Sequence, residues 1–225
     1  MGTGAAPRFF TGPDNWDSIF EAGRTFSDCP IKSEDVGVAA TDLVDPRLAV
    51  VFQDLQHVAR LTNYYVEWTL KFKEDMVILI ALSSIQSRLL RLDGELVDTL
   101  SECIRLAMLA FLTTTFQVPG ERRVLPYGPL AVGFRDSCRA VDASVPDIRD
   151  IFFWVLMVGA ISVLAVDGPD GPDEPWLLPK WDIVSGPEGS WEAARDRLHA
   201  VMWVDCFHDE LGREAFTKLT ARDAS

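Results

Sequence analysis

Apolar residues recur at helical spacing along most of the chain from residue 45 onward. Asp45 followed by Pro46 predicts the start of the first helix, because Asp is a favourable N-cap and Pro at the first helical position loses no hydrogen bond. The positions that follow at i, i+3 and i+4 spacing are Leu48, Val51, Phe52, Leu55, Val58 and Thr62. This spacing predicts an amphipathic helix with one buried face.

Two further helices are expected before residue 120. One covers about Glu74 to Leu92 and ends at Asp93-Gly94, since Gly is a strong stop signal for a helix. The other covers about Leu96 to Phe116 and is apolar on nearly every side in its middle. A helix without a polar face is typical of a buried position, so this helix is predicted to be central.

A turn at 119–123 and a shorter helix, from Pro126 or Pro129 to about Val141, are expected next. Pro146 is then expected to start the most apolar helix, which runs to about Val166. Its last sixteen residues carry no charge, and no Lys or Arg flanks them. A membrane-spanning helix needs about 20 apolar residues. We therefore expect a second central core helix and no membrane contact.

The C-terminal third begins with the sequence DGPDGPDEP at 167–175, which predicts a loop because Gly, Pro and Asp favour turns. A short element is expected over 176–183. Ser190 is a favourable N-cap for the next helix, whose buried stripe begins at Trp191. A last helix is expected over about Glu210 to Leu219.

No segment shows the strict alternation of a strand or the dipeptide of a tight hairpin. The pattern therefore predicts an all-α protein, a single irregular bundle of about seven to eight helices around two apolar central helices. Residues 45–225 would form this domain.

Residues 1–44 lack helical periodicity and are rich in Gly, Pro, Asp and Thr, so they predict a flexible or loosely docked N-terminal arm. The arm carries five aromatic residues of note, several of them beside Asp or Glu: Phe9, Phe10, Trp16, Phe20 and Phe26. Such mixing can mark an activation or docking segment. The interpretation we favour is an arm that packs on its own domain.

Composition narrows the function classes. The chain has 225 residues, a formal net charge of −13 and a pI near 4.6. Direct DNA binding by this chain is therefore not expected, because phosphate neutralisation needs a basic surface. The four cysteines are far apart and form no CxxC pair, which is typical of a reducing compartment.

No catalytic residue, metal site or cofactor is predicted from motifs. The acidic residues at 167–174 are spaced by three and do not fit a calcium-binding loop. Asp205, His208 and Asp209 fall within one helical turn but lack a further ligand, so we interpret them as capping and ion-pair residues. If the chain were an enzyme, Asp205 and His208 would be its acid–base candidates. His57 and His199 are expected to face solvent.

Seven tryptophans are many for this length, and most lie in the C-terminal third. The candidates for a ligand pocket or an interface are Trp154, Trp176, Trp181 and Trp203. The alternative is core packing with the indole N–H groups at the periphery.

Three segments, in this order, resemble one family. They are SECIRLAMLAFLTTTF at 101–116, FFWVLMVGAISV at 152–163, and the segment at 190–219 that contains Trp203-Val204-Asp205. Together they resemble the C-terminal fungal-specific transcription factor domain that follows zinc-cluster DNA-binding modules. The resemblance covers about residues 45–220. The zinc-cluster module itself, with its six closely spaced cysteines and basic residues, has no counterpart in this sequence.

The resemblance implies an all-α regulatory domain, often found in regulators of secondary metabolism or nutrient use. Its partners would be proteins, either a full-length transcription factor or a second copy in a homodimer, with or without a small-molecule effector. A nuclear location follows from the resemblance alone, and a cytoplasmic one is the alternative. Two other functions stay open, a biosynthetic cyclase or isomerase with a hydrophobic substrate in a Trp-rich pocket, and a scaffolding subunit.

Overall fold

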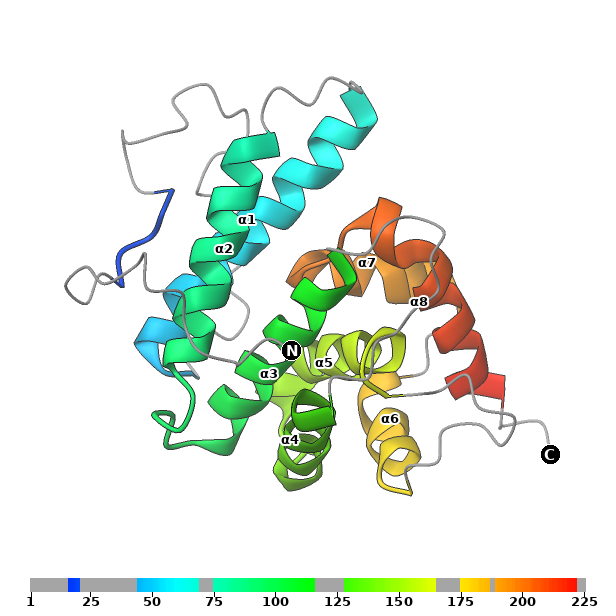
Figure 1. Cartoon of the computed structure of the whole chain (residues 1–225). Coiled ribbons are helices and arrows are strands. Elements are labelled where there is room, and N and C mark those ends of the chain that lie inside the picture. The colour runs from blue at the N-terminus through cyan, green and yellow to red at the C-terminus, as the bar shows by residue number, and fades with distance from the viewer. Residues whose placement is uncertain are drawn as a thin grey trace.

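The structure, a computed structural model, describes residues 16–20, 44–68, 75–115, 128–164, 175–186 and 189–221. Within these ranges every regular element is helical, which confirms the all-α prediction (Figure 1). The elements are α1 (Pro46–Trp68), α2 (Asp75–Arg91), α3 (Thr99–Thr115), α4 (Gly128–Ala140), the 3-10 helix η4 (Pro146–Ile148), α5 (Arg149–Ile161), α6 (Leu177–Ser185), α7 (Trp191–Val201) and α8 (Asp205–Thr220).

The α5 helix forms the centre of the bundle. All eleven residues from Ile151 to Ile161 are buried, and α3, α6, α7 and α8 all pack against this helix. The α3 helix also packs against α2 and α4, and most of its residues are buried. The prediction of two apolar central helices is therefore confirmed. No helix in the described ranges has the length and apolar character that a membrane span requires.

Two helix starts lie where local chemistry predicts them. At the start of α1, Asp45 Oδ1 accepts a hydrogen bond from the backbone N–H of Arg47 at 2.9 Å. At the start of α7, Ser190 Oγ accepts one from the N–H of Ala193 at 3.2 Å. Both side chains therefore satisfy backbone donors that a helix leaves unpaired in its first turn.

Two predicted boundaries are wrong. The α5 helix ends at Ile161 and not near Val166, because the Gly159 carbonyl accepts hydrogen bonds from the N–H groups of residues 162, 163 and 164 as the chain turns. The α8 helix starts at Asp205, five residues before the predicted start at Glu210. The predicted turn at 119–123 and residues 167–174 of the predicted loop lie outside the described residues.

The α1 and α2 helices pack along each other on one side of the bundle (Figure 1). Residues 16–20 of the predicted arm lie against these two helices, where Ser18 and Ile19 are bonded to Asp54 of α1. Apart from Val44, the rest of the arm lies outside the described residues, and the domain boundary at 44/45 stays a prediction.

Candidate functional site

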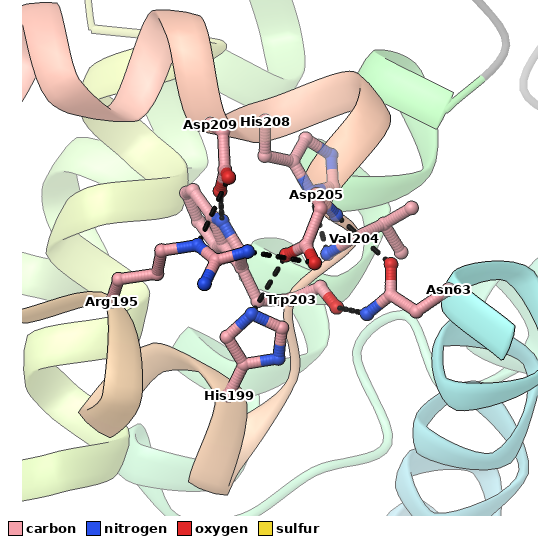
Figure 2. Close-up of polar contacts among 8 residues, drawn as sticks. All are labelled: Asn63, Arg195, His199, Trp203, Val204, Asp205, His208 and Asp209. Atoms are coloured by element: carbon pink, nitrogen blue, oxygen red, sulfur yellow. Dashed lines mark hydrogen bonds and ion pairs between the residues drawn. The ribbon is translucent and has the colours of Figure 1, made fainter. Parts of the chain in front are cut away.

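The two acid–base candidates, Asp205 and His208, both lie in the first turn of α8 (Figure 2). The chain approaches this turn in an extended conformation at Val204, directly after α7. Asn63 of α1 bridges the approach, because its Nδ2 donates to the Trp203 carbonyl at 2.8 Å and its Oδ1 accepts from the Asp205 N–H at 3.0 Å. Asn63 therefore ties the α7–α8 connection to α1.

The Asp205 carboxylate belongs to a half-buried ion-pair network between α7 and α8. Its two oxygens lie 2.8 Å from Arg195 Nη2 and 2.7 Å from His199 Nε2. Arg195 Nε also lies 2.9 Å from Asp209 Oδ2, and the other oxygen of Asp209 accepts from the Trp203 indole N–H. Two carboxylates in the first turns of α8 are also favoured by the positive end of its dipole. Asp205 and Asp209 therefore make the predicted ion pairs, whereas no side-chain cap is present at the N-cap position, Val204.

His208 points the opposite way, into the core. Its side chain is fully buried, between the rings of Phe111 and Trp203 at centroid distances of 4.7 and 4.9 Å. Nδ1 accepts from the Val204 N–H at 3.2 Å, so the neutral ring carries its proton on Nε2, which lies 2.8 Å from Thr114 Oγ1. Burial lowers the pKa of His208 to about 3. Asp205 and His208 are thus held by different partners, one at the surface and one in the core.

Three of the four tryptophan candidates lie inside the core. Trp154, Trp181 and Trp203 are all buried, and Trp176 is half-buried at the start of α6. The Trp154 indole donates to the Met202 carbonyl at 2.6 Å, and the Trp181 ring packs against Phe153 and Phe216. These contacts, all with residues of the chain itself, are those of core side chains.

No group of three or more His, Cys, Asp or Glu side chains in the described ranges is arranged to hold a metal ion. The network around Asp205 instead matches each carboxylate with a basic group or an N–H donor. The ion pairs of Arg195 hold α7 against α8, and the hydrogen bonds of Asn63 hold α1 against the connection between them.

The most specific polar arrangement on the other side of the bundle holds residues 16–20 of the arm. Asp54, on α1, is only 1% exposed and is paired with Arg88 of α2, Nη2 to Oδ2, at 2.5 Å. Asp54 Oδ1 accepts a hydrogen bond from the Ser18 hydroxyl at 2.5 Å, and Oδ2 accepts one from the Ile19 N–H at 3.2 Å. Arg88 Nη1 also reaches the carbonyl of Asp17, at 3.5 Å. One buried ion pair thus binds both the backbone and a side chain of the segment.

Aromatic contacts hold the two ends of the same segment. The Trp16 ring lies under the guanidinium groups of Arg47 and Arg91, at 5.6 and 5.7 Å from the ring centroid, which is cation–π distance. The Phe20 ring stacks on His57 of α1 at a centroid distance of 4.2 Å. The prediction that His57 faces solvent is wrong, because this residue is 8% exposed. Burial lowers its pKa, although the nearby Asp54 acts in the opposite direction.

We name the surface formed by Arg47, Asp54, His57, Arg88 and Arg91 the α1–α2 docking site. Asp54 and Arg88 belong to no sequence motif, but their spacing from neighbouring apolar residues indicates that both are buried. Asp54 is three residues after Val51 and four before Val58, and Arg88 is three after Ile85, so two opposite charges interrupt two apolar stripes. Charges at such positions are stable when they pair.

Comparison with known proteins adds no relative. No family model matches the chain, and no curated protein or solved structure matches it.

Proposed function

We propose that this chain is a regulatory domain of the transcription-factor type, which acts through protein partners and has no DNA-binding module of its own in this sequence. The observation that carries the proposal is the docking of residues 16–20 on α1 and α2. An acidic-aromatic segment, Trp-Asp-Ser-Ile-Phe, is held by cation–π, stacking and ion-pair contacts. A surface that binds one short segment in this way is suited to bind a similar segment of a partner.

The resemblance to the fungal-specific transcription factor domain supports the same proposal. Its three segments fall on α3, on the central helix α5, and on α7 with α8, and α3, α7 and α8 all pack against α5. A nuclear location and a role in secondary metabolism are part of this proposal and rest on the resemblance alone.

The alternative of a biosynthetic enzyme draws no support from its two acid–base candidates. A histidine with a pKa of about 3 is neutral at physiological pH, and both ring nitrogens of His208 already face partners inside the protein. Asp205 faces Arg195 and His199, which compete with any substrate for its carboxylate.

The test tethers residues 1–225 to a heterologous DNA-binding module beside a reporter gene. We expect reporter output to rise or fall relative to the module alone, and to change again when Phe20→Ala removes the stacking on His57. Val97→Ser is the matched control, because this apolar side chain is fully exposed and lies outside the docking site. Unchanged output from a well-expressed fusion would contradict the proposal.

A further inference from the structure

Residues 16–20 form a compact set of contacts in which each residue has its own partner. Trp16 lies under two arginines, the Asp17 carbonyl faces Arg88, and Phe20 stacks on His57. Trp16, Ile19 and Phe20 also pack against the hydrophobic core. The centre of the set is Ser18, which meets the buried ion pair.

The Ser18 hydroxyl uses both of its hydrogen-bonding functions. It donates to Asp54 Oδ1 at 2.5 Å and accepts from the N–H of Phe20 at 3.1 Å. The donor is essential at this place, since a carboxylate can only accept. Any group that replaces the hydroxyl hydrogen therefore removes the bond to Asp54.

A phosphate is the modification that changes this contact most. It would put a charge of about −1.5 to −2 next to the buried carboxylate of Asp54. The charge of Arg88 does not compensate, because Arg88 Nη2 is already paired with Asp54 at 2.5 Å. Two further cations lie close to the segment: Arg47 already binds Asp45 and Glu95, and Arg91 lies over the Trp16 ring. The repulsion between the phosphate and the Asp54 carboxylate therefore outweighs the attraction of the phosphate to the nearby arginines.

We propose that Ser18 is a phosphorylation site and that its modification releases residues 16–20 from the α1–α2 docking site. In the reaction, a protein kinase transfers the γ-phosphoryl group of a nucleoside triphosphate to Ser18 Oγ. The P–O bond to the nucleoside diphosphate breaks, the Oγ–P bond forms, and the hydroxyl proton leaves to solvent. The kinase must accept an acidic neighbour, because Asp17 precedes Ser18.

Release uncovers a defined surface. Without the segment, His57 loses its stacking partner and the Asp54–Arg88 pair loses the cover of Ser18 and Ile19. The freed site could then take a segment of a partner with the same chemistry, an aromatic residue followed by an acidic-polar pair. This inference concerns the docking itself and stands or fails independently of the reporter experiment.

The experiment uses the full chain with phosphoserine incorporated at position 18 and measures amide hydrogen exchange. The Ile19 N–H reports docking, because it donates to Asp54 of α1, and the Phe20 N–H reports the local turn, because it donates to Ser18 Oγ. We expect their exchange to accelerate at least about tenfold on phosphorylation. A smaller acceleration, or slower exchange, overturns the proposal.

Phosphoserine at position 144 is the matched control. The Ser144 hydroxyl also donates to a carboxylate, that of Asp142 at 2.7 Å, but both residues are exposed and lie between α4 and η4. We expect this modification to leave the exchange of Ile19 and Phe20 unchanged. Acceleration by both modifications would overturn the proposal, because it would reflect added charge and not the contact with Asp54.

A second variant tests the mechanism, because it should reverse the direction in which phosphorylation changes the hydrogen exchange of Ile19. Asp54→Asn removes the repelling carboxylate and leaves Arg88 without its partner, so a phosphate on Ser18 gains a cation to bind. In Asp54→Asn, phosphorylation should therefore slow the exchange of Ile19, the reverse of its effect in the wild-type chain. Circular dichroism first establishes that the variant is folded. Acceleration in the folded variant equal to that in the wild type overturns the proposed mechanism.

Discussion

Arg88 Nη2 lies 2.5 Å from Asp54 Oδ2, and both side chains are almost wholly removed from solvent, with 7% and 1% of their surface exposed. The pair joins α1 to α2 and also anchors residues 16–20 through Asp54. Such a pair contributes little net stability when intact. Removal of one partner is strongly destabilising, because the remaining buried charge keeps its desolvation penalty without a compensating attraction. The pair is therefore a sensitive point of the fold.

Arg88→Met should lower the free energy of unfolding by about 3–5 kcal/mol, because Asp54 is then buried without its cation. The double variant Asp54→Leu with Arg88→Met should recover most of this loss. Urea denaturation at neutral pH measures all three proteins. The control is Arg139→Met, since the Arg139–Asp136 contact is 3.4 Å long and exposed. It should cost less than about 1 kcal/mol, and equal losses for the two single variants would contradict the prediction.

His208 gives the protein a pH dependence of known sign. Its pKa is about 3 in the folded protein and about 6.5 in an unfolded chain, so the unfolded state binds the extra proton between these values. Stability contributed by neutral His208 is therefore present above pH 6.5 and is lost as the pH falls. Relative to His208→Asn, which does not titrate, the wild type should lose about 2–3 kcal/mol between pH 7 and pH 4.5.

The measurement is a set of urea denaturation curves for both proteins at several pH values. The difference between the two proteins isolates His208, because the many carboxylates titrate in both. A difference that stays constant from pH 7 to pH 4.5 would show that His208 is accessible to protons in the folded state.

Features that depend on local sequence were predictable, and those that depend on contacts between distant segments were not. The cap at Ser190 is set by the residues beside it, and so is the buried stripe of α1 that begins at Leu48. The start of α8 was placed too late because the Asp205 N–H is capped by Asn63, which lies 142 residues earlier. Nothing in the sequence around Asp205 contains that information.

The candidate sites show the same division. The sequence placed Asp205, His208 and Asp209 on one helical turn, but only packing decides that His208 faces Phe111 while Asp205 faces Arg195. The Asp54–Arg88 pair was missed, since periodicity alone does not say which helices become neighbours. The resemblance to a transcription-factor domain and the roles it implies stay predictions.

Gly159 has no room for a side chain. A Cβ atom there would lie 2.5 and 2.6 Å from Phe134 ring atoms, and Phe134 is fully buried. Gly159→Ala should therefore destabilise the protein by about 1–3 kcal/mol, although Ala is the better helix former. The control is Gly133→Ala in α4, where the nearest atom, on Leu106, would be 3.5 Å away. Thermal melts should show stabilisation by about 0.5–1 kcal/mol in the control, and the same sign in both variants would contradict the packing argument.

Asn63→Ala should uncouple the α7–α8 connection from α1. The variant loses the hydrogen bond to the Trp203 carbonyl and the one from the Asp205 N–H, so both backbone groups lose their Asn63 partner. We expect a loss of about 1–3 kcal/mol in the free energy of unfolding, and faster hydrogen exchange at the Asp205 amide. Thr62→Ala is the matched control, because the hydroxyl of this neighbouring residue donates to the Val58 carbonyl of its own helix. Asn63→Asp separates the two bonds, since its carboxylate still accepts from Asp205 but repels the Trp203 carbonyl. Protection at Asp205 that survives in Asn63→Asp and fails in Asn63→Ala would identify the Asn63 side chain as the tertiary N-cap that sets the start of α8.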